Sequence, residues 1–491
     1  MITETEILPS LSAIKAPGDH VGPRTLELLA QSQKYEPRSM SEHVPIVWKR
    51  GERCFIEDID GNVFLDFTSG VLVANAGHSH PRLVAAMKDQ VGKVVNSYDF
   101  VNEFRPELAQ RLVEITPPNM DKALVLTTGS EVTEAAMKLA RLHTGRKEIV
   151  SFHGGFHGRT FGAMSAGGKR SGASTKGFGP FVPGFHQAPF ANCYRCVFDK
   201  KFPDCMNLET NPRSWIKHSQ SLQTGSTPYC LDYLDWFAET ETESDIAGVI
   251  VESYQGGAGS IIPPKEWMQG LAAWCKEHGI VLIADEVQAS FGRTGKMFCF
   301  EHYGVEPNLL CLGKGISSSV PVAALVGESA IMDKLGPGTM SSTHGGNALS
   351  SRIALENISI IQDEKLAENA AAMGEICRAR FETFKAEYSC LADARGLGLV
   401  WGLEIGDVNN PIPKQPDAKT AKAIVHAAWK RGLLMIAPVG HYGNVLRLAP
   451  PLIITETELN VALDILAEAF AECSGHGKVS DTLESDEDRA D

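Results

Sequence analysis

The chain has 491 residues, enough for a large core and for more than one domain. Lys and Arg number 46 against 60 Asp and Glu, and the net charge of −14 disfavours nonspecific attraction to nucleic acid or to an anionic membrane. We find no secretory signal pattern at the start and no apolar run near the roughly 18 residues that span a bilayer. We therefore expect a cytoplasmic protein that binds neither nucleic acid nor membrane and keeps its 11 cysteines reduced.

Four segments of different character follow one another along the chain. Residues 1–69 begin with a mixed stretch, expected to be an arm or irregular cap, and continue with a period-two pattern and an Asp-Gly-Asn turn that predict antiparallel strands. These strands are expected to pack with a smaller α+β domain at 346–474, which includes a long helical stretch over Ser351–Tyr388. Residues 70–345 are predicted to form a large domain, and 475–491 a disordered acidic tail.

Strand-like and helix-like segments alternate within the large domain. The predicted strands lie at 123–128, 148–152, 247–251, 280–284 and 308–312. Trp267, Leu271 and Trp274 recur at helical spacing before Gly279, where a helix stop is expected. This alternation predicts an α/β fold with a mostly parallel central sheet covered on both faces.

An acidic pair ends one of these predicted strands. In the run IVLIADEVQASFGR at 280–293, Asp285 and Glu286 directly follow the apolar residues, at the edge where open α/β sheets bind ligands. For this pair alone, an alternative is that one acid caps the following loop and the other faces solvent.

A single lysine follows the last predicted strand. Lys314 lies between two glycines in the run NLLCLGKGISSS. A lysine at a buried strand end is rare without a function, and burial lowers the pKa of an amine and makes it a nucleophile toward an aldehyde. The alternative for this segment alone is a surface lysine on a flexible loop.

Two more segments suggest ligand contacts. At 126–138, a strand, then Gly129 and Ser130, then a helix form a layout that binds phosphate through backbone N–H groups, although Ser130 can instead be an ordinary N-cap. In SFHGGFHGRT at 151–160, an aromatic residue is able to stack on a planar ring and Arg159 to pair with a carboxylate. The alternative is a turn with a structural arginine.

Together these segments resemble the class III aminotransferases, which have the fold-type-I architecture of pyridoxal-phosphate enzymes. The resemblance covers roughly residues 40–470. Its most specific blocks are DEVQ-x-x-FGRTG at 285–295 and GKG at 313–315, in company with GSE, FHGRT, THGGN and RLAPPL. It implies pyridoxal 5'-phosphate as cofactor and an activity similar to that of the 4-aminobutyrate aminotransferases.

The resemblance also implies roles for individual residues. Lys314 matches the family's Schiff-base lysine and Asp285 the carboxylate that pairs with the pyridine nitrogen. Gln288 matches the partner of the ring hydroxyl oxygen, and Glu252 a glutamate near the cofactor. No metal ion is expected to take part.

Further cofactor contacts are implied around the ring and the phosphate. They come from Val287, Phe156, His157, Gly129, Ser130 and Thr343. Thr343 matches a threonine that reaches the phosphate of the neighbouring subunit, so the resemblance implies a homodimer with two shared active sites.

Substrate contacts are implied for two arginines and two pocket positions. Arg447 matches the arginine that holds the α-carboxylate of glutamate or 2-oxoglutarate, and Arg159 a second one for a distal carboxylate. Val71 and Tyr98 match pocket-lining positions. The family often has a glutamate, here replaced by Gly257, that engages the substrate-binding arginine, so its switch between ω-amino and α-amino substrates is missing or built differently. A structural salt bridge is the alternative for each arginine.

Four cysteines gather between two large-domain elements. They are Cys193, Cys196, Cys205 and Cys230. Four thiols are able to bind zinc or an iron–sulfur cluster, but the second pair lacks the close spacing of the first, and we expect reduced thiols in a surface loop.

The leading hypothesis is an aminotransferase with ping-pong chemistry, which takes an amino group from an ω-amino acid or amine and gives it to a small keto acid such as pyruvate or 2-oxoglutarate. Relatives with the same motifs act as racemases, decarboxylases or phospho-lyases, and these stay as alternatives. A noncatalytic scaffold is disfavoured by the presence of Lys314, Asp285 and Gln288 together.

Overall fold

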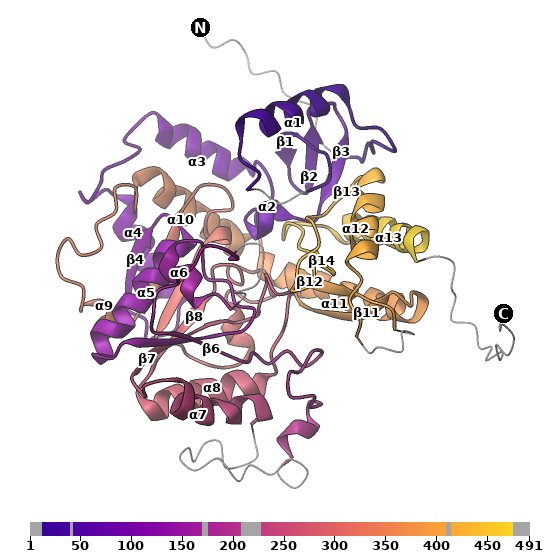
Figure 1. The fold of residues 1–491 in the computed structure, drawn as a ribbon. Coiled ribbons are helices and arrows are strands. Elements are labelled where there is room, and N and C mark those ends of the chain that lie inside the picture. Colours follow the sequence, from indigo (N-terminus) through magenta and orange to yellow (C-terminus); the bar gives the residue numbers. More distant parts are fainter. Residues whose placement is uncertain (1–11, 40–42, 169–174, 208–226, 409–413, 475–491) are drawn as a thin grey trace, which may run out of the picture.

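The computed structural model describes residues 12–39, 43–168, 175–207, 227–408 and 414–474. Three sheets organise these residues: a large central one, one near the amino terminus and one in the carboxyl-terminal part (Figure 1). The predicted acidic tail at 475–491 lies outside the described residues. The chain division predicted at residues 69, 345 and 474 stays a prediction.

The central sheet has seven strands in the order β4-β10-β9-β8-β7-β5-β6. The strands are β4 (Lys122–Leu126), β5 (Glu148–Phe152), β6 (Phe185–Ala188), β7 (Ile246–Glu252), β8 (Val281–Asp285), β9 (Leu309–Leu312) and β10 (Ala323–Gly327). Neighbours from β9 to β6 are parallel, whereas β10 is antiparallel to both β9 and β4. The predicted α/β fold with a mostly parallel sheet is confirmed, with one reversed strand.

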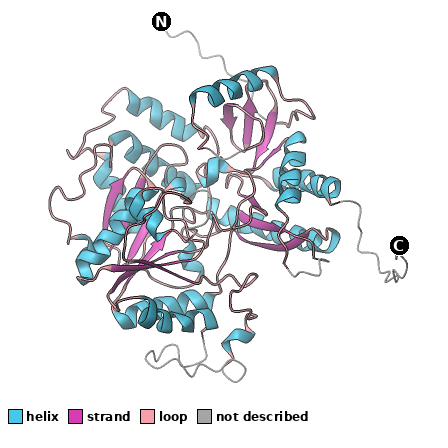
Figure 2. Cartoon of the chain, viewed as in Figure 1, coloured by secondary structure: helices cyan, strands magenta, loops and turns pink. Residues whose placement is uncertain are grey.

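Helices cover both faces of this sheet (Figure 2). Helix α5 (Gly129–Thr144) packs its apolar residues on one face, against side chains such as Ile250 and Ile283. Helix α8 (Lys265–His278) packs Trp267, Leu271 and Trp274 on the other. It ends at Gly279 with φ +61°, as the sequence predicts. Strands β7, β8 and β9 are therefore wholly buried, which explains their unbroken apolar runs.

The amino-terminal sheet confirms the predicted antiparallel strands. It contains β1 (Trp48–Glu52), β2 (Phe55–Asp58) and β3 (Val63–Asp66), and β3 pairs in parallel with β13 (Leu433–Leu434) of the carboxyl-terminal part. The expectation of an arm or irregular cap before these strands is wrong for α1 (Pro23–Tyr35), a regular helix that a proline opens.

The carboxyl-terminal part contains a sheet of β11 (Leu391–Leu397), β12 (Val400–Ile405) and β14 (Val445–Leu448), with helices α12 (Ala418–Lys430) and α13 (Glu456–Cys473). The helical stretch predicted over 351–388 is confirmed, but it is not one continuous helix. It is two helices, α10 (Ala348–Asp363) and α11 (Leu366–Glu387), separated where Lys365 takes a left-handed conformation with φ +51°.

The remaining helices are short or lie at the periphery. They are α2 (Ser69–Leu72), α3 (Pro81–Val91), α4 (Phe104–Ile115), α6 (Phe161–Ala166), α7 (Tyr229–Glu241), α9 (Ser329–Met332) and the 3-10 turns η1 (Asp204–Met206), η2 (Cys299–His302) and η3 (Lys314–Ile316). Among the helices of the described residues, none has the length and apolar character needed to cross a membrane.

Arg293 joins the loop after β8 to both flanking parts of the fold. Its fully buried guanidinium group donates to the carbonyl oxygens of Leu399 (3.0 Å) and Pro450 (2.6 Å) and to the side-chain oxygen of Asn75 (2.8 Å). Burial lowers its pKa to about 10, so the group stays charged near neutral pH.

Candidate active site

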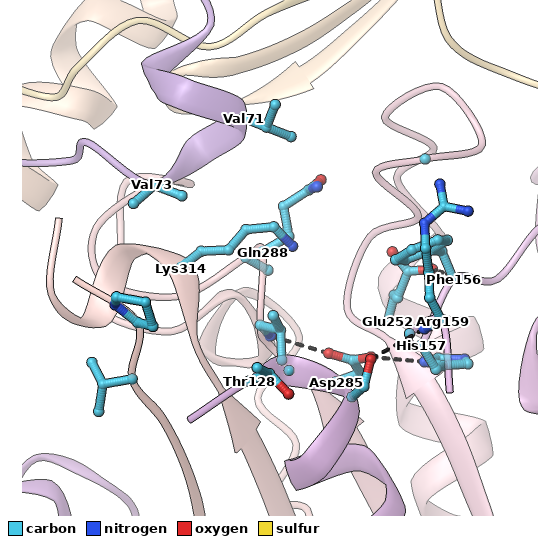
Figure 3. Close-up of a pocket in the computed structure, with 18 of the residues that line it drawn as sticks. Val71, Val73, Thr128, Phe156, His157, Arg159, Glu252, Asp285, Gln288 and Lys314 are labelled. Carbon is cyan, nitrogen blue, oxygen red and sulfur yellow. Dashed lines mark hydrogen bonds and ion pairs between the residues drawn. The ribbon is translucent and has the colours of Figure 1, made fainter. Parts of the chain in front are cut away.

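A cavity of about 610 Å³ opens at the carboxyl ends of the central strands (Figure 3). Parallel strands deliver their loops to this edge, where ligands bind in open α/β sheets. The structure brings twelve of the predicted site residues to its wall: Val71, Gly129, Ser130, Phe156, His157, Arg159, Glu252, Asp285, Val287, Gln288, Lys314 and Arg447.

Thr343 and Tyr98 do not line this cavity. Both are exposed and belong to two neighbouring surface segments. The side-chain amide of Asn102 donates to the carbonyl oxygen of Gly346 at 2.9 Å, and Ser341 donates to Asp99. Within one subunit, these two residues therefore lie together but away from the other predicted site residues.

Lys314 lies immediately after β9, at the start of η3, with a left-handed backbone (φ +44°). Burial lowers the pKa of its amine; the neighbouring Asp285 and Glu252 oppose that shift, and Arg447 adds to it. A non-glycine residue in this conformation is held by its surroundings and is typical of functional sites. In Figure 3 its side chain extends into the cavity beside Gln288.

Asp285, the last residue of β8, is held by two hydrogen bonds. One oxygen accepts from the Val287 backbone N–H (3.1 Å) and the other lies 2.7 Å from Nδ1 of His157. Burial alone lowers the pKa of His157, but the hydrogen bond to Asp285, together with the charges of Asp285 and Glu252, raises it overall. The buried imidazole thus faces the carboxylate and fixes its orientation.

Glu252, the last residue of β7, accepts hydrogen bonds from the backbone N–H groups of Phe156 (2.9 Å) and Gly256 (3.1 Å). Burial raises the pKa of its carboxyl to about 7, and the negative charge of Asp285 adds to this, against the opposing effect of His157 and both backbone bonds. The side chain therefore ties two cavity loops together and changes charge near neutral pH.

The amino end of α5 is built to receive an anion. Thr128 is the N-cap and forms a capping box with Glu131, whose carboxylate accepts from the backbone N–H groups of Thr127 (2.9 Å) and Thr128 (2.8 Å). Gly129 and Ser130 then begin the helix at the positive end of its dipole. The alternative of Ser130 as N-cap is wrong; its Oγ instead accepts from the backbone N–H of Arg159 at 3.1 Å.

Close packing explains two glycines of the cavity wall. A Cβ on Gly129 or on Gly313 would lie 3.0 Å from a methyl carbon of Val287. Val287 therefore presses between the α5 end and the lysine loop, which leaves a flat wall suited to one face of a planar ring. Phe156, at the right of Figure 3, is 45% exposed and has the Arg159 guanidinium 5.6 Å from its ring centre.

The acid next to Asp285 is structural. Glu286 is fully buried and accepts from the backbone N–H groups of Cys299 (2.8 Å) and Phe300 (2.9 Å), and from the Ser253 hydroxyl. The alternative that one of the pair faces solvent is wrong for both acids, because Asp285 is also buried.

Two arginines face the cavity without a carboxylate partner. Arg447, on β14, is only 5% exposed, and within the described residues neither it nor Arg159 makes an ion pair. A structural salt bridge therefore explains neither residue in this part of the chain. A buried cation without a counter-charge is costly, and a carboxylate ligand would relieve that cost.

Some wall residues escaped the sequence analysis. They include Thr128, Tyr254, Ser319 and Val320, whereas Val73, close to Val71 in the same predicted entry segment, lines the wall as expected. Tyr254 belongs to the run VESYQGG that carries Glu252, and its position two residues after a strand end was the available signal.

The four cysteines of the insertion line one small cavity of about 20 Å³ together with aromatic side chains. Among the described residues, no group of three or more Cys, His, Asp or Glu side chains has the arrangement that would hold a metal ion. Burial raises the pKa of Cys193 to about 11, so this thiol stays protonated near neutral pH.

The raised pKa of Glu252 predicts a pH-dependent stability. The folded protein keeps this proton up to about pH 7, whereas an unfolded chain releases it near 4.5. The contribution of the protonated Glu252 carboxyl to the free energy of unfolding is therefore complete below about pH 4.5 and is lost as the pH rises through 7. In Glu252→Gln we expect the loss of stability between pH 5 and pH 8 to shrink by on the order of 2 kcal/mol.

Thermal unfolding at both pH values measures this change. Glu382→Gln, at a surface carboxylate with a 64% exposed side chain, is the control. An identical pH slope in Glu252→Gln and in the parent protein would show that another group holds the proton.

Comparisons with known proteins agree with this geometry. The sequence model "Aminotransferase class-III" matches residues 37–470. A probable 4-aminobutyrate aminotransferase of Bacillus subtilis is 35% identical, over 85% of this chain and 91% of the relative, and an alanine/serine racemase of Pyrococcus horikoshii is 33% identical over 91% of each. The crystal structure of an (S)-enantioselective omega-transaminase from Thermomicrobium roseum superposes with a TM-score of 0.81 at 28% identity, over 91% of this chain and 98% of that one.

The cavity suits the cofactor of that family. It offers a lysine amine, a buried carboxylate, a flat apolar wall and a helix amino end for a phosphate, all at one strand edge. With the family match over most of its length, the chain belongs to the class III aminotransferases, enzymes that use pyridoxal 5'-phosphate to transfer amino groups between amino and keto compounds.

Proposed function

We propose that the enzyme takes an amino group from an ω-amino acid or amine, similar to 4-aminobutyrate, and gives it to a keto acid such as 2-oxoglutarate or pyruvate in a ping-pong reaction. Arg447 carries this proposal, because it is a buried, unpaired cation at the cavity wall and suits the carboxylate of a keto acid. The similarity to the Bacillus subtilis relative supports the donor class.

The proposed cofactor contacts follow the geometry of the wall. Lys314 would hold the cofactor covalently, and Asp285 would pair with its pyridine nitrogen. Gln288 would donate to the ring hydroxyl oxygen. The remaining contacts would come from Val287 and Phe156 on the ring faces and from His157, Gly129, Ser130 and, from a second subunit, Thr343.

The cofactor supplies an electron-withdrawing ring and a carbonyl group that carries the amino group between half-reactions. The chain supplies the proton chemistry. Lys314 Nζ, with its pKa lowered by burial, is suited to take and return the proton of the carbon that bears the amino group. Asp285, oriented by His157, would keep the pyridine nitrogen of the cofactor protonated. Glu252 fixes the backbone of Phe156 through a hydrogen bond and would thereby hold that side chain at the ring.

The side chains of the cavity wall also suggest how the enzyme distinguishes its substrates. Arg159 would bind a distal carboxylate, and Val71 and, from a second subunit, Tyr98 would limit the size of the substrate. Gly257 provides no carboxylate for Arg447, so an ω-amino donor without an α-carboxylate has to bind while this arginine stays unpaired. That arrangement favours acceptors with an α-carboxylate.

Racemisation is the second candidate, because the Pyrococcus horikoshii relative of similar identity is an alanine/serine racemase. Both reactions need the same lysine and the same ring partners. Mixing the holoenzyme with a panel of ω-amino acids, amines and α-amino acids, with and without a keto acid, separates them. A keto product would support transamination, and inversion of an α-amino acid without a keto product would contradict it.

We also propose a homodimer in the cytoplasm. Apolar side chains crowd the segment after α3, where Phe100 is 78% and Val101 75% exposed, and the loop of Thr343 is hydrogen-bonded beside it. An exposed apolar patch next to residues that lie apart from the cavity supports a second subunit at this surface. Buried free thiols such as Cys275 and Cys311 suit a reducing compartment.

Lys314→Ala is expected to abolish covalent attachment of the cofactor and to lower the rate of amino transfer by about 10⁴-fold or more, because the nucleophile and the proton carrier are lost together. Borohydride reduction and peptide mass spectrometry locate the adduct. Lys276→Ala, at an exposed lysine on α8, is the control. An adduct on another lysine would contradict the assignment.

Arg447→Met is expected to raise the KM for the keto acid by about a hundredfold, since a buried charge-assisted pair is lost. The rate of the half-reaction with an amine that has no carboxylate should change little. Following the two half-reactions separately by absorbance gives both values. Equal losses in both half-reactions would mean that Arg447 shapes the cavity and does not bind the carboxylate.

Phe100→Glu is expected to weaken the dimer by at least about tenfold in Kd, because a charge replaces a large apolar contact. Sedimentation velocity over a range of protein concentrations measures the dissociation. Val461→Glu, a similar change on α13, is the control. A parent protein that sediments as a monomer at micromolar concentration would contradict the proposal.

A further inference from the structure

Tyr254 is a buried phenol at the wall of the cavity. It lies two residues after β7 and is 1% exposed. Its hydroxyl donates to Oε1 of Gln288 at 3.2 Å, and within the described residues this hydroxyl has no second hydrogen-bond partner. The contact joins the loop after β7 to the loop after β8.

The surroundings decide the direction of this hydrogen bond. The nearby cations, Arg293 and Arg447, are guanidinium groups, which only donate. Burial raises the pKa of Tyr254 far above its usual value, and the two arginine charges oppose this without reversing it, so the phenol keeps its proton. Glu252 is near enough for its charge to raise this pKa as well, but the hydrogen bond of the hydroxyl goes to Oε1 of Gln288, which accepts it.

Packing holds the same oxygen in place. A Cβ on Gly256 would lie 1.6 Å from Oε1 of Gln288, so only a glycine leaves room for the amide there. With Oε1 turned to Tyr254 and Gly256, the amide nitrogen Nε2 is the donor left for the cavity, where Gln288 lies beside Lys314 in Figure 3.

We propose that Tyr254 is a positioning residue that holds the Gln288 amide with its Nε2 toward the ring hydroxyl oxygen of the cofactor. The inference rests on the proposed role of Gln288. A carboxamide is able to present either end to a ligand, and a fixed phenol donor removes one of these two choices. Tyr254 thereby acts on the ring oxygen without touching the cofactor.

The test is a pH titration of the visible absorption band of the holoenzyme. An N–H donor stabilises negative charge on the ring oxygen. This stabilisation is greatest when the nitrogen that joins Lys314 to the cofactor has lost its proton. In Tyr254→Phe we therefore expect the titration midpoint to move up by about half a unit or more. The cofactor should also bind the apoenzyme about threefold to tenfold more weakly.

Tyr303→Phe is the matched control. Tyr303 is 3% exposed and donates to the carbonyl oxygen of Ser253 at 2.8 Å. The control therefore removes a comparably buried hydroxyl that does not contact Gln288. An equal shift of the midpoint in Tyr303→Phe would overturn the inference, because the effect would then come from a general disturbance of the core.

Gln288→Ala and the double variant separate the inference from the proposed function. If Tyr254 acts through the amide, Tyr254→Phe adds no further shift once Gln288 is alanine. A shift in Gln288→Ala that is absent in Tyr254→Phe would overturn the inference and leave the proposed contact standing. An unshifted band in Gln288→Ala would contradict the contact of Gln288 with the ring.

Discussion

The buried guanidinium group of Arg293 connects the three parts of the fold that enclose the cavity. It lies in the loop that also carries Asp285 and Gln288, and it donates to Asn75 on one side and to Leu399 and Pro450 on the other. Burying a cation among neutral acceptors is costly, and these hydrogen bonds offset part of that cost. They tie the loop that carries Asp285 and Gln288 to the segment of Asn75 and to the residues beside β14, the strand that carries Arg447.

The charged residues around the cavity form two groups. Asp285 and His157 form a buried pair at the base, while Lys314 and Arg447 face the open space with lowered pKa values. Glu252, with a pKa of about 7, lies between the two groups. Because low polarity strengthens every one of these interactions, small displacements of a loop change several protonation equilibria at once.

Most of the site followed from the sequence, because parallel strands buried on both faces leave apolar runs and deliver the residues after them to one edge. Asp285 and Lys314 were found in this way, whereas Glu252, at the end of β7, came only from the family resemblance. The reversed direction of β10 leaves no mark in a short apolar run, and the break at Lys365 has neither glycine nor proline to announce it. The capping role of Thr128 was hidden beside Ser130, because serine has the higher N-cap propensity of the two.

Contacts between separate loops were beyond the reach of the sequence. The hydrogen bond from Tyr254 to Gln288 depends on two loop conformations and on a glycine that makes room for them. Under the proposed dimer, the roles of Thr343 and Tyr98 depend on a second subunit, and a single sequence gives no geometry for a neighbour. The sequence thus predicts which residues lie at strand ends, but it does not predict which residues of other loops they contact.

A single substitution at Gly257 would change the balance of charge in this cavity. The glycine has an ordinary backbone, and a Cβ there would meet only the Cβ of Phe156 at 3.7 Å, so the site admits a side chain. Filling it with an acid would give Arg447 an internal counter-ion and stabilise the empty protein, at the expense of competition with every incoming carboxylate. Under the proposed role of Arg447, a substrate carboxylate neutralises that charge, and bound substrate then also stabilises the fold. A related protein with an acid at this one position would be stable without a bound ligand, but its arginine would bind carboxylate ligands less readily.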